Sequence, residues 1–323
     1  MGLRRRSFLQ LAAAAAASVP RLALALDYPT RPVHLIVTVP AGGSPDIVGR
    51  LIAQWLSEKL GQPFVVENRP GASGNIGTEV VVKSAPDGYM LLLAMSANAI
   101  NASTFRHMNF NFIHDTEPVA KISGIPLVML ANPGVPAQSV PEFIAYAKAR
   151  PGKINMATAG TGTPLHVAGE MFKMMTGVDM VDVPYQGESL AMPDLISGQD
   201  QILFGVVPGS LGYIRSGKLR ALAVTSAQRQ AVLPGVPAMA EFLPGYEASG
   251  WYGVAAPKGT PAAVIDALNK TINAGLADPA TKGRLADLGC EVSPGTPADF
   301  GKFIVDETQK WAKVVKFANI KAD

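Results

Sequence analysis

The sequence predicts an α/β protein made of two lobes that are joined by two chain crossings, in the form of a clamshell. Strand-like apolar runs alternate with helical patterns along the chain, which indicates parallel sheets connected by helices. These runs form two sets, and each set contains one glycine-rich loop at an equivalent place. The chain has 323 residues, of which 48% are hydrophobic, so it is long enough for two domains with full cores.

The chain begins with a predicted export signal, residues 1–25. Arg4–Arg6 precede the apolar stretch Phe8–Val19, and Ala23–Ala25 has the small residues of a cleavage site. The six residues from Arg5 to Gln10 resemble a twin-arginine signal. We therefore expect a periplasmic protein whose mature chain begins just after residue 25.

Removal of this signal changes the charge of the chain. The whole sequence has a formal net charge of +3, and residues 1–25 contain four arginines and no acid, so the mature chain carries −1. A charge so close to zero argues against nucleic acid or an anionic membrane as a partner. The single cysteine, Cys290, excludes a disulfide within the chain and a zinc site built from several cysteines.

The first lobe is expected to comprise residues 26–125 and to be completed by residues 251–323. Its predicted elements are strands at Val33–Val39, Phe64–Glu67 and Met90–Met95, and helices at Pro45–Leu60, Pro261–Ala277, Pro279–Leu288 and Pro297–Phe317. In the first of these helices, apolar residues from Ile47 to Leu60 recur at helical spacing and form one face.

The second lobe is expected to comprise residues 126–250. Its predicted strands, with helices between them, are Ile154–Ala157, Met180–Val183, Gln201–Val206 and Leu219–Thr225. The two crossings are predicted in the proline-punctuated stretch Pro118–Pro136 and in Tyr246–Pro257. A ligand of such a clamshell binds between the carboxyl ends of the strands, at helix N-termini.

The two glycine-rich loops, Pro40–Asp46 and Thr158–Pro164, share one local design. In each, Ser44 or Thr163 is predicted as the N-cap of a helix whose first residue is the following proline. The additional glycines have no side chains to cover the backbone, so an anion can approach the free N–H groups at the positive end of the helix dipole. Gly-Thr-Pro also occurs twice later in the chain, where it indicates only a helix start. Two such loops facing one cleft would hold an anion from both sides.

The sequence carries no complete enzyme motif. Gly187–Ala191 resembles the nucleophile elbow of hydrolases but lacks its last glycine, and none of the four histidines follows Ser189. The fingerprint of a dinucleotide site begins at Gly160 but lacks its third glycine, and the histidines show no metal-ligand spacing. His166, in the first turn after Thr163, is interpreted as a buried or capping residue in preference to one that transfers protons. We therefore expect no catalysis, no cofactor and no metal.

Several motifs, taken in order, make the chain resemble the Bug family of periplasmic solute receptors, which serve tripartite tricarboxylate transporters. The likeness extends from Tyr28 to Ile320. The motifs that carry it are Val39–Gly43 with Asp46, Leu60–Gln62, Val66–Ala72, Asn75–Gly77, Pro86–Tyr89, Thr161–Thr163 with His166, Ala168–Glu170, Val183–Tyr185, Gly217–Thr225 and Trp251. No single motif is unique to the family, and the resemblance depends on their number and order.

The resemblance implies the two-lobed type II periplasmic binding protein fold, or Venus flytrap fold. It also implies a monomeric receptor that holds a small carboxylate by backbone amides and small polar side chains and delivers it to membrane permease subunits. The ligand-binding residues that it implies are Ala41, Gly42, Gly43, Asp46, Ser96 and Asn98 in the first lobe, and Thr158, Gly160, Thr161, Thr163, His166, Asp182, Tyr185 and Gln186 in the second.

Three positions depart from the family pattern near the expected far end of the ligand. Gln186 stands where the family often has lysine, Glu188 adds a negative charge, and Gly205 replaces a residue that is frequently polar. We therefore expect a monocarboxylate, or a ligand with a polar neutral far end, in preference to a highly anionic one such as citrate. Two alternatives remain: a periplasmic hydrolase or isomerase on the same scaffold, and a receptor whose partner is a sensor protein.

Overall fold

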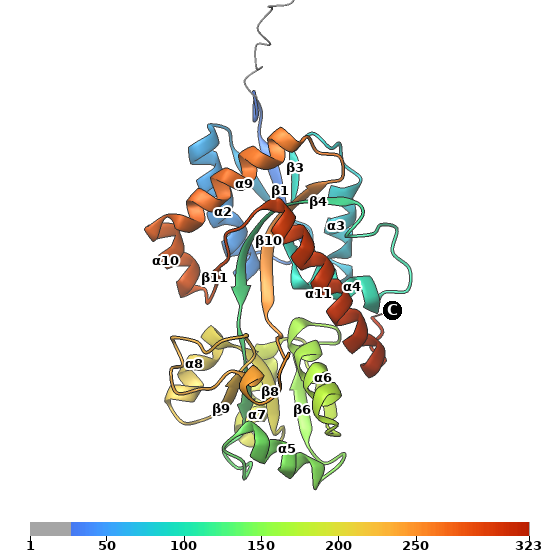
Figure 1. Cartoon of the computed structure of the whole chain (residues 1–323), viewed down its shortest axis with the longest axis vertical. Coiled ribbons are helices and arrows are strands. Elements are labelled where there is room, and N and C mark those ends of the chain that lie inside the picture. The colour runs from blue at the N-terminus through green and yellow to red at the C-terminus, as the bar shows by residue number, and fades with distance from the viewer. Residues whose placement is uncertain (1–26, 323) are drawn as a thin grey trace, which may run out of the picture.

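The structure is a computed structural model that describes residues 27–322. Residues 1–26 and 323, which include the predicted export signal, lie outside the described residues. The described residues form eleven strands in two separate sheets, and we call the part around each sheet a lobe (Figure 1). None of the helices between residues 27 and 322 is both long and apolar enough to cross a membrane.

The first sheet has six strands in the spatial order β11–β4–β10–β3–β1–β2. They are β1 (Val33–Val37), β2 (Phe64–Asn68), β3 (Met90–Met95), β4 (Thr116–Ile125), β10 (Gly250–Pro257) and β11 (Glu291–Val292). β1 is parallel to β2 and β3, as the alternation of strand and helix patterns predicts. β10 is antiparallel to β3 and β4, and β11 is antiparallel to β4, which the sequence analysis did not predict.

The second sheet has five strands in the spatial order β7–β6–β8–β5–β9. They are β5 (Leu127–Ala131), β6 (Asn155–Thr158), β7 (Val181–Pro184), β8 (Ile202–Val206) and β9 (Arg220–Val224). β6 is parallel to β7 and β8, whereas β5 is antiparallel to β8 and β9. In both sheets, therefore, the antiparallel strands include those that adjoin a crossing between the lobes.

Helices cover both faces of each sheet. The first lobe contains α2 (Ser44–Leu60), α3 (Asn75–Val82), α4 (Ser96–Thr104), α9 (Ala262–Ala277), α10 (Pro279–Asp287), α11 (Pro297–Ala318) and the short helix η1 (Ala72–Gly74). The second lobe contains α5 (Val140–Lys148), α6 (Pro164–Thr176), α7 (Glu188–Ser197), α8 (Val207–Arg215) and η2 (Met239–Glu241). Successive strand residues point to opposite faces, so Leu35 packs with α2 and α9 while Ile36 packs with α3, α4 and α11.

The chain passes between the lobes at Pro126, which separates β4 from β5, and again in residues 246–249, just before β10. Both crossings lie within the stretches that the sequence predicts for them, Pro118–Pro136 and Tyr246–Pro257, although most of both stretches forms strands. Every residue of β5 and β10 is buried, so these apolar runs pair within the sheets up to the crossings.

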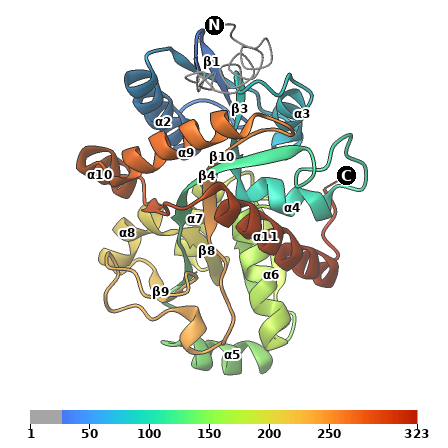
Figure 2. The same cartoon turned by 45° about the horizontal axis from the view of Figure 1, so that its top comes forward.

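The long C-terminal helix α11 contacts both lobes. It packs along α4 and β4 of the first lobe and against α6 of the second (Figures 1 and 2). Trp311 of α11 and Phe172 of α6 are both fully buried in one apolar cluster. The two lobes therefore share part of their core along this helix.

Candidate functional site

The carboxyl ends of the parallel strands in the two sheets meet near the first crossing. In the second sheet, Leu127 at the start of β5 pairs with Val206 at the end of β8. In the first sheet, Ile125 at the end of β4 pairs with Gly250 at the start of β10. Tyr252, also in β10, pairs with Met95 at the end of β3. The loops that leave β1, β3, β6, β7 and β8 therefore lie at the edges where the lobes adjoin.

The first glycine-rich loop is held by the carboxylate of Asp46. This side chain accepts hydrogen bonds from the Gly42 amide at 2.9 Å, from Arg50 Nε at 3.0 Å and from Asn68 Nδ2 at 2.9 Å. The hydrogen bond from Arg50 is the main reason why the pKa of Asp46 is lowered to about 2, and Gly42 and Asn68 contribute further. Asp46 is only 3% exposed, so it positions the loop from within the first lobe.

The start of α2 differs from the sequence prediction. Its N-cap is Gly43, with no capping side chain, and Ser44 is already helical, so the predicted Ser44 cap was wrong. Asp46 bonds the loop from the first turn of the helix, and the loop reverses at Gly42, where φ is +91°. Gly43 itself has an extended conformation with φ of −79°.

The second loop has the same internal bond, made by a different side chain. The Gly162 amide donates to Nδ1 of His166 at 3.0 Å, four residues along, as Gly42 donates to Asp46. Thr163 caps α6 by accepting the His166 amide, which confirms its prediction as the N-cap. Because Nδ1 accepts a hydrogen bond, the neutral ring of His166 carries its proton on Nε2.

Several backbone amides at these two helix starts have no hydrogen-bond partner among the described residues. They include the amides of Gly43, Ser44 and Asp46 at the first start, and those of Gly160, Thr161 and Leu165 at the second. Each set lies at the N-terminus of a helix of thirteen or more residues. Free amides at the positive end of a helix dipole are a favourable environment for an anion.

A cavity of about 310 Å³ lies between the two lobes at this place. Its first-lobe wall consists of Thr38–Pro40, Pro70, Gly71, Ser73, Gly74, Ala97 and Asn101, and its second-lobe wall consists of Thr161–Pro164. The hydroxyl oxygen of Thr38 is buried and has no hydrogen-bond partner among the described residues. Two predicted ligand residues, Thr161 and Thr163, thus face the first lobe across this cavity.

A second cavity of about 330 Å³ adjoins the other side of the α6 start. It is lined by Thr158, Thr161, His166, Asp182, Pro184 and Ala318–Lys321. The cavity therefore brings four predicted ligand residues, from β6, β7 and the start of α6, together with residues 318–321. The contribution of Ala318–Lys321 was not predicted, since a segment without a motif gives no indication of its position.

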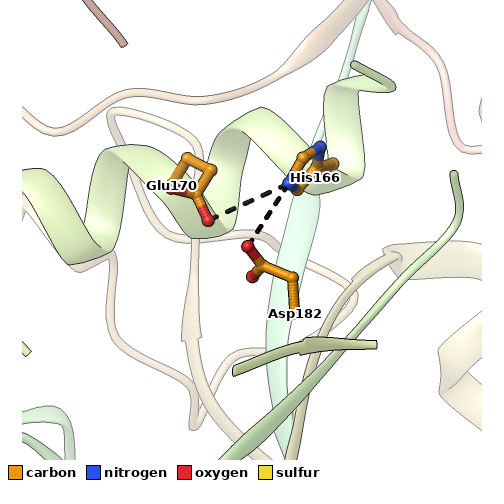
Figure 3. Close-up of side chains that lie close together, drawn as sticks. All are labelled: His166, Glu170 and Asp182. Carbon is orange, nitrogen blue, oxygen red and sulfur yellow. Dashed lines mark ion pairs between the residues drawn. The ribbon is translucent and has the colours of Figure 1, made fainter. Parts of the chain in front are cut away.

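His166 and Asp182 also belong to a compact charged cluster (Figure 3). Nε2 of His166 lies 3.9 Å from a Glu170 oxygen and 3.8 Å from an Asp182 oxygen. The Lys173 ammonium lies between the same two carboxylates, 2.6 Å from Glu170 and 3.1 Å from Asp182. Burial raises the pKa of Glu170, whereas His166 and Lys173 overcome the effect of burial and lower the pKa of Asp182.

The ligand atoms of His166, Glu170 and Asp182 lie within 4.8 Å of one another, as a metal site would require. Two features argue against a metal ion. The Lys173 ammonium already provides the positive charge that the carboxylates need, and Nε2 of His166 carries a proton while Nδ1 is occupied by the Gly162 amide. The arrangement therefore favours an ion-pair cluster that supports the wall of the second cavity.

The other predicted ligand residues have different surroundings. Asn98 is 3% exposed and its side chain bonds the Met95 amide and the Thr78 hydroxyl, so it shapes the start of α4. Ser96 is buried at the same helix start. The Tyr185 hydroxyl lies 2.7 Å from both Asp194 and Asp200, within the second lobe. Ala41 and Gln186 are exposed, at the two loops that border the cleft.

Comparison with known proteins identifies the family of the chain. The model of the tripartite tricarboxylate transporter family receptor matches residues 48–320. The chain belongs to this family. It is 40% identical to Protein BugT from Bordetella pertussis over 297 residues, and these residues cover 91% of each chain. The predicted resemblance to the Bug family is therefore confirmed.

Two solved structures with a similar fold contain a carboxylate. R. palustris Rpa4515 with adipate is 37% identical and superposes with a TM-score of 0.78, covering 91% of this chain and 99% of that one. MatC from Rhodopseudomonas palustris with bound malate is 29% identical with a TM-score of 0.74, covering 89% and 100%. These neighbours confirm the two-lobed periplasmic binding protein fold. The family is one of extracytoplasmic solute-binding receptors, not of enzymes, so the hydrolase or isomerase alternative is set aside.

Proposed function

We propose that this chain is a periplasmic receptor that binds one small carboxylate between its lobes and delivers it to the permease of a tripartite transporter. The observation that carries this proposal is the pair of helix starts with unused amides, at Gly43–Asp46 and Gly160–Leu165. Membership of the receptor family and the carboxylates held by its solved relatives support it.

The proposed site needs no lysine or arginine in contact with the carboxylate. Hydrogen bonds from amides to a charged acceptor are shorter and stronger than those between neutral groups, and a helix dipole adds to them. Asp46 and His166 take no direct part in this proposal, because their acceptor atoms hold the amides of Gly42 and Gly162. They fix the loop backbones so that the neighbouring amides point outward.

The export signal and the partner complete the proposal. A chain with the predicted leader at residues 1–25 reaches the periplasm and acts there as a monomer. A family receptor of this kind delivers its ligand to permease subunits in the membrane, and a sensor protein is the alternative partner. Export from cells that carry Arg5→Lys with Arg6→Lys tests the twin-arginine route, since loss of both arginines should prevent it.

A thermal-shift panel of carboxylates, sugars and amines tests the binding proposal. A ligand present at about 100 times its Kd should add roughly 2.7 kcal/mol to the free energy of unfolding. The amide analogue of the best acid is the control, because it keeps the shape and removes the charge. Stabilisation by sugars alone, or equal stabilisation by the acid and its amide, would overturn the proposal.

A further inference from the structure

One acidic side chain of the second lobe, at the start of a helix beside the crossing, has no cationic partner among the described residues. Glu188 is the first residue of α7, the helix that leaves the carboxyl end of β7. Its Oε1 accepts the Val206 amide at 3.1 Å, and neither carboxylate oxygen forms an ion pair with any described residue. Glu188 is therefore a half-buried carboxylate with one backbone hydrogen bond, and its Oε2 has no hydrogen-bond partner among the described residues.

The position of this carboxylate depends on Gly205. A Cβ atom on residue 205 would lie 2.5 Å from Oε1 of Glu188, and also 3.1 Å from the Ser210 hydroxyl. Any side chain at position 205 would therefore displace the carboxylate from the Val206 amide. The two residues act as one feature: the missing side chain of Gly205 makes the room that the carboxyl group of Glu188 occupies.

The end of β8 places this feature beside the first crossing between the lobes. Val206 pairs with Leu127, the residue next to the first crossing, and the Val207 amide donates to the Pro126 carbonyl at 3.3 Å. The side chain of Val206 also packs against the first-lobe cluster that contains Met95. Glu188 is thus attached to the backbone that lies directly beside the first lobe.

A carboxylate in this position is costly unless something compensates it. Burial raises the pKa of Glu188 to about 7, and the Val206 amide opposes this effect only in part. No cationic side chain among the described residues pairs with it, so the compensating group can come from the ligand.

We propose that Glu188 accepts a hydrogen bond from an ammonium group at the end of the ligand remote from the bound carboxylate, so that the receptor selects zwitterionic acids over dicarboxylates. This inference rests on the proposed carboxylate site at the two glycine-rich loops. A second carboxylate on the ligand meets a like charge at Glu188 and can bind only after a proton is taken up, whereas an ammonium group restores neutrality directly.

Calorimetric titration of the mature chain at pH 7.5 tests this inference with acids of matched length. The probes are 4-aminobutanoate against succinate and 6-aminohexanoate against adipate. For the length that binds, we expect the amino acid to bind at least tenfold more tightly than the diacid. Glu188→Gln should reduce this preference at least tenfold while leaving the melting temperature close to that of the parent.

Two further variants separate the role of Glu188 from a general effect. Gly205→Ala retains the glutamate but displaces its carboxylate, so it should lose the preference as Glu188→Gln does. Glu142→Gln is the matched control: Glu142 lies in the first turn of α5, accepts a backbone amide, and is exposed. It should leave the preference unchanged.

The outcomes distinguish this inference from the proposed function. If the parent binds the diacid as tightly as the amino acid, or if folded Glu188→Gln keeps the parent's preference, the inference is wrong although the carboxylate site stands. If no probe and no acid of the wider panel binds, the proposed function is wrong and this inference fails with it.

Discussion

Gly289 of the first lobe lies directly against Pro208 of the second. A Cβ atom on Gly289 would be 1.9 Å from Cγ of Pro208, so no other residue fits without movement. Gly289 belongs to the turn between α10 and β11, and Pro208 is the second residue of α8. This contact between lobes lies beside the crossing, and it therefore helps to set how closely the lobes approach one another.

We expect Gly289→Ala to move the lobes apart and to weaken ligand binding, although residue 289 is not in the proposed site. The measurement is the radius of gyration by small-angle scattering, together with the Kd of the best acid from the thermal-shift panel. Gly217→Ala is the matched control, because Gly217 has a φ of +70° against +72° for Gly289 and nothing lies within 4 Å of its Cβ position. If both variants give the same scattering and affinity, the contact with Pro208 does not set the approach of the lobes.

We expect Asp46→Asn to lower the free energy of unfolding by roughly 2 kcal/mol at pH 7, from the size of the pKa shift. The pKa of Asp46 is lowered from 3.8 to about 2 in the folded protein, so the native state holds this proton less tightly than the unfolded chain. The stabilisation is therefore complete above pH 4 and is lost as the pH falls through 2. Urea unfolding at pH 7 and at acid pH measures it.

The difference in the free energy of unfolding between Asp46→Asn and the parent should become smaller as the pH is lowered. Asp306→Asn provides the control, since its carboxylate is exposed and paired with Lys302 at the surface. An exposed pair of this kind contributes little. Equal losses in the two variants at pH 7, or a loss in Asp46→Asn that does not depend on pH, would show that Asp46 does not hold the loop as a carboxylate.

The fold was predictable in segments where apolar residues recur at the spacing of a helix. The helices at Ser44–Leu60, Ala262–Ala277 and Pro297–Ala318 each bury one face, and their predicted bounds agree with the structure to within one residue. β4 and β5 were not predicted as strands. β5 is an apolar run buried on both faces, so it shows no alternation, and β4 contains Pro118, which with Pro126 indicates a loop. Pro126 is indeed a break, but it lies between two strands.

The candidate site was predictable only as local helix starts. Glycines and the Thr163-Pro164 pair indicate where α6 begins, since capping depends on neighbouring residues. The partners of these loops come from far along the chain: Asn68 bonds Asp46, and Lys321 lies in a cavity with Thr158. The carboxyl group of Glu188 likewise occupies the space beside Gly205 where a side chain would lie, and no sequence pattern connects these two positions. Such contacts are decided by the packing of the two lobes.

We expect Gly43→Val to abolish carboxylate binding without loss of stability. Gly43 has a φ of −79°, which valine adopts readily, and a Cβ there meets only Pro45, at 3.6 Å. The branched side chain would occupy the space in front of the free amides. Loss of two charge-assisted amide bonds costs on the order of 3–6 kcal/mol, which moves micromolar binding out of measurable range.

Gly162→Val tests the second loop but requires a stability measurement beside it. Gly162 has a φ of +74°, and a β-branched residue in the left-handed region costs at least 1–2 kcal/mol. Denaturant midpoints therefore accompany each Kd. If both valine variants are folded and bind the best acid as tightly as the parent, the carboxylate does not contact these loops.

The last prediction concerns the ammonium of Lys173, which we expect to be essential for the cluster around His166. Lys173→Met leaves Glu170, whose side chain is 3% exposed, and Asp182 without their shared cation, and breaking a buried ion pair typically costs 3–5 kcal/mol. Burial already raises the pKa of Glu170, and loss of Lys173 should raise it further, so the folded variant binds a proton that the unfolded chain releases near pH 4.5. The stability of the variant is therefore retained at pH 4–5 and lost as the pH rises. In urea unfolding, the difference in the free energy of unfolding between the variant and the parent should increase between pH 5 and pH 8.

The control for this prediction is Lys302→Met, which removes an exposed lysine that pairs with Asp306 and should cost less than about 1 kcal/mol at either pH. A loss in Lys173→Met no larger than in Lys302→Met, or one that is the same at pH 5 and pH 8, would mean that the buried carboxylates are compensated by another group.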